Sequence, residues 1–101
     1  MLFRSHPKIK GQSKREHSFA FLLDGEYIDV IGANHTATGA TMRKAGDVKN
    51  SPYLYGRDIR VVIDDRFEPE RAEVERQILG SLVKAMTLTK LQELGNPARS
   101  H

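Results

Sequence analysis

SFAFLLDGEYIDVIG, residues 18–32, is the stretch from which the fold can be built. Two runs of alternating apolar residues flank the dipeptide Asp24-Gly25, and Asp-Gly in this setting is the strongest short-range signal for a two-residue hairpin turn. A turn of this length fixes which residues of the two strands face each other. The predicted cross-strand pairs are Leu23 with Glu26, Leu22 with Tyr27, Phe21 with Ile28 and Phe19 with Val30.

The two faces of this hairpin differ in apolar content. Successive side chains of a strand point to opposite faces, so the cross-strand pairs divide into two sets. The set richer in aromatic and β-branched residues should form the core, and it consists of Phe19, Phe21, Ile28 and Val30. The other face is either a protein interface or ordinary half-exposed strand surface. Its candidate interface residues are Leu22, Tyr27 and Ile31.

A third strand is predicted over residues 58–64, where apolar residues alternate with Arg60. Tyr53 and Tyr55 keep the same parity, so this strand could begin at Tyr53. The two tyrosines have two interpretations. They are exposed stacking platforms for nucleic-acid bases, or they pack against the core as aromatic side chains usually do.

A helix is predicted to begin at Pro69, because proline is favoured at the first helical position. Glu70 and Glu73 then lie in the first turn, where the helix dipole stabilises negative charge. Apolar residues at helical spacing continue as far as Met86, and a break near Thr87 separates them from a short leucine stripe. That stripe is a second candidate interface, and its residues are Leu88 and Leu91, followed by Leu94.

Between the hairpin and the third strand lie 25 residues, 33–57, with few large apolar side chains. Unbroken loops of this length are uncommon in compact domains and are usually functional or disordered. Three readings of the segment remain open. Thr38 caps a short helix that runs to Ala45 and ends at Gly46, or the segment is a mobile basic flap, or it is a plain connector.

Charge is unevenly distributed along the chain. The formal net charge is +3, but residues 64–75 hold six acids and two arginines, a local −4, so the rest of the chain carries +7. This layout attracts polyanions by steering and counterion release, although a plainly solvated surface can look the same. Candidate nucleic-acid contacts lie in the N-terminal residues and in the 33–57 segment: Lys8, Lys10, Lys14, Arg15, Arg43, Lys44, Lys49, Tyr53 and Tyr55.

The residue types that support catalysis do not combine into a known set. The four histidines are not at metal-ligand spacing from one another, and the chain has no cysteine. His35 lacks the partners that a catalytic triad requires, and a capping or turn role explains it equally well. Residues 39–44 lack the Lys-Ser/Thr pair of a phosphate loop. We therefore expect a protein that is not an enzyme and that uses no metal or cofactor.

Together these patterns predict one small α+β domain, in which a small antiparallel sheet of hairpin plus third strand is packed by a C-terminal helix. A basic N-terminal arm is expected over residues 1–17, the domain over 18–95 and a C-terminal tail over 96–101. The apolar surface exceeds what three strands can cover, which favours a homodimer or larger homo-oligomer. No apolar run resembles a signal peptide or a membrane span, so we expect no membrane partner and a cytoplasmic (or nuclear) location.

Two functions fit this description. The first is a small accessory protein that binds DNA or RNA through the N-terminal arm and residues 33–57. The second is a protein–protein interaction module, such as an adaptor, an inhibitor or an assembly subunit. It would act through the exposed sheet face or through the leucine stripe.

Overall fold

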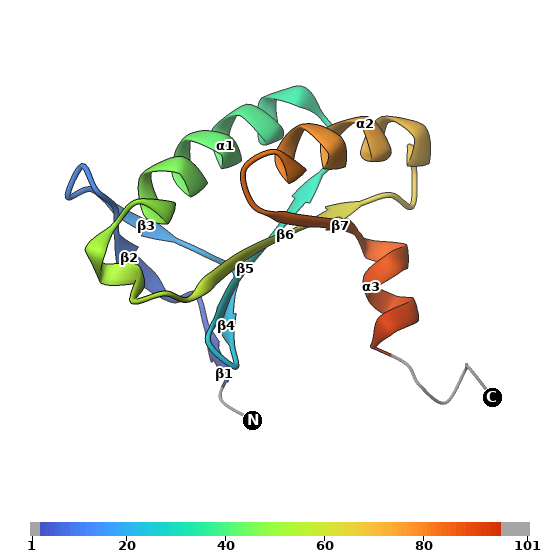
Figure 1. Cartoon of the computed structure of the whole chain (residues 1–101). Helices are drawn as coiled ribbons and strands as arrows, with labels where there is room; N and C mark the ends of the chain where they lie inside the picture. The colour runs from blue at the N-terminus through green and yellow to red at the C-terminus, as the bar shows by residue number, and fades with distance from the viewer. Residues whose placement is uncertain (1–2, 96–101) are drawn as a thin grey trace.

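A mixed five-stranded sheet with two helices on one face organises the chain, so the α+β class is as predicted (Figure 1). This computed structural model describes residues 3–95. The spatial order of strands is β1–β4–β5–β6–β7, and a separate two-stranded sheet pairs β2 with β3. The elements are β1 (Phe3–Ser5), β2 (Lys8–Lys10), β3 (Glu16–Ser18), β4 (Phe21–Leu23), β5 (Glu26–Gly32), α1 (His35–Lys49), the 3₁₀ turn η1 (Pro52–Leu54), β6 (Asp58–Asp64), α2 (Pro69–Gly80), β7 (Lys84–Thr87) and α3 (Leu88–Leu94).

The hairpin between β4 and β5 has the predicted turn and, from Phe21 to Ile28, the predicted register. Asp24 and Gly25 both adopt positive φ, 50° and 81°, as the favoured two-residue hairpin turn requires. β4 begins only at Phe21, so the expected pairing of Phe19 with Val30 does not extend this ladder. Phe19 is instead buried in the core, 2% exposed.

The prediction of an antiparallel three-stranded sheet is wrong, because β6 pairs with β5 in parallel. The cause is α1, a 15-residue helix that carries the chain back from the end of β5 to the start of β6. α2 repeats this return and adds β7 parallel to β6. Both crossovers step in the same direction across the sheet, so right-handed connections place α1 and α2 on the same face, as Figure 1 shows.

The segment 33–57 is mostly helical. The side-chain oxygen of Asn34 caps α1 by accepting the Ala37 N–H at 2.8 Å. The predicted short helix from Thr38 to Ala45 is therefore the interior of a longer one. Its inward face consists of small and hydroxyl-bearing residues, which gave little apolar periodicity in the sequence. The buried residues of α1 are Thr38, Thr41, Ala45 and Val48.

α2 begins at Pro69 as predicted, but it ends at Gly80, well before the predicted break near Thr87. The chain then forms β7 instead of a continued helix. A four-residue edge strand is too short for its period-2 pattern to be distinguished from the end of an apolar helix. The predicted break near Thr87 is confirmed, because a separate helix, α3, begins there and the Thr87 hydroxyl caps it by accepting the Lys90 N–H at 3.3 Å.

The core lies on the face of the hairpin opposite to the predicted one. Tyr27 is 4% exposed beneath the helices, whereas Phe21 and Val30 are 36% and 47% exposed. The assignment fails because α1 covers the Tyr27 side of β5, whereas the sequence pattern offered only a shorter helix as one reading and did not place it on the sheet. Leu22 and Ile31 are half-buried on the same covered face and pack against core residues. The residues predicted as an exposed interface are thus part of the interior.

The expected basic arm contains three of the strands. β1 extends the main sheet beside β4, and the β2–β3 hairpin lies next to the C-terminal end of α1 (Figure 1). The basic residues of this part of the chain are therefore held by folded elements. The C-terminal tail expected over residues 96–101 lies outside the described residues.

Candidate nucleic-acid interface

Asp47 on α1 holds the loop of the β2–β3 hairpin. Its carboxylate accepts the Ser13 N–H at 2.8 Å and the Ser13 hydroxyl at 2.6 Å, and it lies 2.7 Å from Nε2 of His17. Its backbone carbonyl accepts the Gln12 N–H at 2.8 Å. Gly11 permits this approach, because a Cβ at that position would lie 2.0 Å from Oδ2 of Asp47. The loop is thus fixed to the helix at several points.

The same contacts keep Asp47 ionised. Hydrogen bonds from the Ser13 hydroxyl, from His17 and from the Ser13 N–H, in that order of effect, lower the pKa of Asp47 to about 2. The carboxylate therefore stays charged at neutral pH. Its negative charge subtracts one from the positive charge of the cations around it.

Ser13, His17 and Asp47 are the residue types of a serine-hydrolase triad, but their order in space is different. In a triad the histidine lies between the serine and the aspartate, so that it can take the hydroxyl proton. Here the aspartate lies in the middle, and the Ser13 hydroxyl donates to the carboxylate. This arrangement anchors a loop and does not activate a nucleophile.

A second contact attaches the hairpin to η1. The Ser51 hydroxyl donates to the Lys10 carbonyl at 2.6 Å and accepts the Tyr53 N–H at 3.1 Å. Tyr53 and Tyr55 are 43% and 79% exposed, so their predicted packing in the core is wrong. They belong to the 3₁₀ turn and its cap, and Leu54 between them is the buried residue. Their use as stacking platforms stays a prediction.

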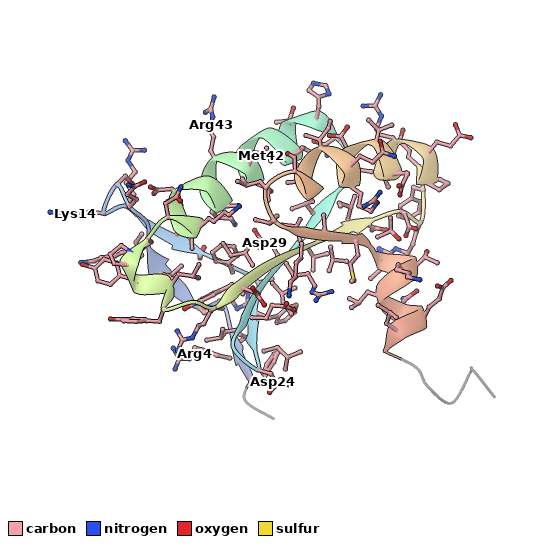
Figure 2. All side chains as sticks on the ribbon, viewed as in Figure 1. Arg4, Lys14, Asp24, Asp29, Met42 and Arg43 are labelled. Carbon is pink, nitrogen blue, oxygen red and sulfur yellow. The ribbon has the colours of Figure 1, made fainter. Side chains whose placement is uncertain are left out.

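Most of the predicted cations come from two parts of the chain that contact each other, the β2–β3 hairpin and the second half of α1 (Lys14 and Arg43 are labelled in Figure 2). Lys14 projects from the hairpin loop, and Arg43 projects from the outer face of α1. Residues four apart on a helix share a face, so Arg43 lies beside Asp47 and hence beside the loop that Asp47 holds. We call this surface, with η1, the basic end. Its exposed cations are Lys8, Lys10, Lys14, Arg15, Arg43 and Lys49.

Lys44 differs from the other predicted phosphate ligands, because its ammonium group has partners within the fold. Its ammonium pairs with Asp29, donates to the Ser18 carbonyl at 2.9 Å and lies 4.7 Å from the centre of the Phe19 ring. Asp29 is 9% exposed and also accepts the Ala20 N–H at 3.2 Å. Lys44 therefore serves the interior, where it compensates a buried carboxylate.

The acidic residues 64–75 lie away from the basic end, around the C-terminal end of β6 and the first turns of α2. Asp64 forms an ion pair with Arg66 at 2.7 Å, and this pair lowers the pKa of Asp64 to about 2. Asp65 accepts both the N–H and the hydroxyl of Thr89, at 3.1 and 2.9 Å. The molecule is thus electrically polarised along its parallel strands.

An open hollow of about 550 Å³ adjoins the basic end, at the start of β6 and β7. Lys49, which lines it, donates to the Leu82 carbonyl at 2.8 Å, and Lys84 donates to Asp58 at 2.8 Å. Both α1 and α2 end here, so these cations offset the negative ends of two helix dipoles. The charge of this hollow therefore has a structural explanation.

The leucine stripe is largely used within the chain. Leu88 and Leu91 are half-buried where α3 packs against β6 and β7. A different apolar group is exposed on the sheet face away from α1 and α2. There the rings of Phe3 and Phe21 lie 5.6 Å apart, with Val30 47% exposed on the same face. This group was missed because Phe21 and Val30 were assigned to the core.

Within residues 3–95, no group of three or more His, Cys, Asp or Glu side chains is placed to hold a metal ion. In the same range, no helix has the length and apolar character needed to cross a membrane. Comparison of the chain with protein-family models, with curated proteins and with solved structures found no match.

Proposed function

We propose that the protein binds nucleic acid through the basic end and acts by binding, without catalysis. The observation that supports this most strongly is the attachment of the hairpin loop to α1 by Asp47. It sets Lys14 and Arg15 beside Arg43 in a folded arrangement. Cations that are already in place lose less conformational freedom on binding than cations on a loose arm.

The charge balance of this surface favours a polyanion. Six exposed cations stand against two carboxylates, the exposed Glu16 and the ionised Asp47, a difference of six minus two, or +4. Glu16 pairs weakly with Lys8, at 3.9 Å with both side chains mostly exposed. Each phosphate that a lysine or arginine neutralises releases condensed counterions, which supplies most of the affinity in non-specific binding.

The exposed tyrosines indicate which form of nucleic acid would bind better. Tyr53 and Tyr55 lie next to β2, and Lys10 in that strand is attached to η1 through Ser51. Bases stack on aromatic rings only when they are not paired within a duplex. We therefore expect single strands to bind more tightly than duplexes of equal length.

Fluorescence anisotropy with labelled single-stranded and duplex DNA and RNA, at about 50 mM salt, tests the proposal. The variant Lys14→Glu/Arg15→Glu should weaken binding at least about tenfold, since two attractive charges become repulsive. The matched control is Arg71→Glu, which reverses an exposed charge on α2, away from the basic end. Equal loss in the control, or no binding by the wild type, would overturn the proposal.

The exposed rings of Phe3 and Phe21 favour a second function, a protein–protein contact on the open sheet face. Apolar surface of this kind marks interfaces more often than polar surface does. The expected homo-oligomer would use the same face. Sedimentation of the wild type and of Phe21→Glu tests it: a dimer that dissociates in the variant supports self-association, and a monomer in both argues against it.

A further inference from the structure

A hollow of about 240 Å³ lies at the β1 edge of the sheet, where the helices do not reach. Its lining comes from β1, β4, the β4–β5 turn and the residue before β6. Figure 2 shows Arg4 at this edge of the sheet, below the segment that leads into β6. The lining residues are Phe3, Arg4, Leu22, Gly25 and Arg57.

The strand register explains why two arginines line the same hollow. Arg4 is paired with Leu22, Leu22 with Tyr27 and Tyr27 with Ile59, so these four side chains form one row on one face of the sheet. Arg57 precedes Ile59 by two residues and lines the same hollow. Neighbouring strands lie about 4.8 Å apart, so two long side chains, from β1 and from the start of β6, can approach over the strands between them.

Neither guanidinium is neutralised. Within residues 3–95, the Arg4 side chain has no hydrogen bond or ion pair, and the Arg57 side chain has one long contact, 3.5 Å from Nη1 to the Tyr27 hydroxyl. The carboxylate next to Arg57 in the chain, Asp58, is bonded to Lys84 at 2.8 Å. None of the described residues that line the hollow is acidic. Two arginines without a counter-charge in a concave site favour an anion.

We infer that this hollow binds a phosphate monoester, with the phosphate held between Arg4 and Arg57. Guanidinium forks match the oxygens of phosphate in bidentate geometry, which a lysine cannot do. Leu22, half-buried beside Arg4 on the same face, supplies an apolar wall for the organic substituent. Gly25 has φ of +81° and open space where a Cβ would point, so the turn leaves the entrance clear.

The volume limits the size of the ligand. Pockets that enclose drug-sized molecules measure about 300–1,000 Å³, and this one is smaller. A small free phosphate monoester fits, and so does the phosphorylated end of a nucleic-acid strand, which has the same chemistry. The inference uses none of the cations of the basic end, so it does not depend on the proposed function.

Titration of the ¹⁵N-labelled protein with phenyl phosphate tests the inference. The amide signals of Leu22 and Gly25 should shift, with weaker binding of inorganic phosphate, which lacks the ring, and no shift with benzyl alcohol, which lacks the charge. Arg4→Ala and Arg57→Ala should each weaken binding about tenfold, as loss of a charged hydrogen bond does. Both arginines are exposed, so the variants should fold, which the same spectra verify.

Arg71→Ala is the matched control and should bind phenyl phosphate like the wild type, because Arg71 lies on α2. An intermediate affinity of Arg57→Lys would support recognition by the guanidinium fork. The inference is overturned if phenyl phosphate shifts neither amide, or if both arginine-to-alanine variants bind as tightly as the control.

A second experiment distinguishes a small free phosphate monoester from the phosphorylated end of a nucleic-acid strand as the ligand. Oligonucleotides of one sequence, with a 5′-phosphate or a 5′-hydroxyl, are compared in the Lys14→Glu/Arg15→Glu background. Tighter binding of the phosphorylated strand, lost in Arg57→Ala, supports the strand end as ligand. Equal binding of both strands, with phenyl phosphate still bound, supports a small free ligand. Failure of both oligonucleotides to bind in this background, with phenyl phosphate still bound, also supports a small free ligand, whereas failure of the wild type to bind any oligonucleotide would contradict the proposed function and leave the phenyl phosphate result intact.

Discussion

Asp47 and Ser13, 34 residues apart in the sequence, are joined by two hydrogen bonds of 2.6 and 2.8 Å. Through this link the loop of a basic hairpin becomes part of the surface of α1. As a result, exposed cations from two distant parts of the chain lie on one surface. Variants that break the link should show whether the anchoring of the loop and the binding of nucleic acid both depend on it.

Asp47→Ala should release the hairpin loop while leaving the main sheet folded. The Ser13 amide then loses its carboxylate acceptor, whereas the Gln12 amide keeps the backbone carbonyl of residue 47 and loses it only as the loop moves away. Both amides should therefore exchange with solvent faster than in the wild type, Ser13 more so than Gln12. Hydrogen-exchange NMR measures this directly. Glu73→Gln is the control, because its carboxylate serves an exposed helical pair with Arg76. Unchanged exchange at both loop amides would show that Asp47 is not the anchor.

Stability should fall at acid pH because of the depressed pKa of Asp47. Its folded-state pKa of about 2 lies below the ordinary 3.8, so the unfolded state binds more protons between these values. The contribution is complete above about pH 4 and is lost as the pH falls toward 2. Asp64 titrates in the same window, with a pKa of about 2 caused by Arg66.

Denaturant unfolding at a series of pH values checks this expectation. Asp47→Asn and Asp64→Asn should each reduce the slope of stability against pH below about pH 4. The double variant should reduce it further, since the two sites share no partner. A slope that both variants leave unchanged would mean that other carboxylates control the acid transition.

Gly11→Ala and Gly39→Ala add the same methyl group at a crowded and at an open position, so we expect different effects on the protein. A Cβ at Gly11 would lie 2.0 Å from Oδ2 of Asp47, so the loop must move away from the helix and nucleic-acid binding should weaken. A Cβ at Gly39, in α1, meets nothing within 4 Å, so that change should stabilise the protein by about 1 kcal/mol. Thermal unfolding and anisotropy titrations measure both effects. Equal behaviour of the two variants would contradict the close approach at Gly11.

Lys44→Met should destabilise the fold without altering the salt dependence of nucleic-acid binding. It leaves the carboxylate of Asp29 buried without its ion partner, a change that costs about 3 kcal/mol in comparable buried pairs. Lys14→Met should leave the stability of the fold unchanged and reduce the salt dependence of nucleic-acid binding, because Lys14 is exposed on the loop. Urea unfolding and binding titrations of the two variants separate an interior cation from a surface one. A stable Lys44→Met protein with weakened binding would reassign Lys44 to the surface.

Local signals predicted the parts of the fold that depend on neighbouring residues. The Asp24-Gly25 turn, the bounds of β6 and the start of α2 at Pro69 each follow from a few adjacent residues. α1 was predicted only as a short helix and as one of three readings, because its buried face uses Thr38, Thr41 and Ala45 where a pattern search looks for large apolar residues. Without the whole of α1, the buried face of the hairpin and the parallel pairing of β5 with β6 are missed.

The candidate site was likewise predicted in the parts that depend on local sequence and not in the parts that depend on contacts between distant residues. Charge patterning placed Lys14, Arg15 and Arg43 in the correct class of exposed cations. It could not distinguish them from Lys44, whose partner Asp29 is 15 residues away and buried. Contacts between distant residues, such as those of Asp47 with the hairpin loop, leave no signal in a single sequence. The predicted surface was therefore correct in charge but incomplete in what holds it together.

The salt dependence of nucleic-acid affinity tests the central claim most directly. The logarithm of the affinity of the wild type for single-stranded DNA should fall linearly with the logarithm of salt concentration. Each lost phosphate contact should reduce that slope by about 0.7, so Lys14→Glu/Arg15→Glu should reduce it by about 1.4, while Arg71→Glu leaves it unchanged. A wild-type affinity that is independent of salt, or a slope that the double variant does not change, would contradict binding through the basic end.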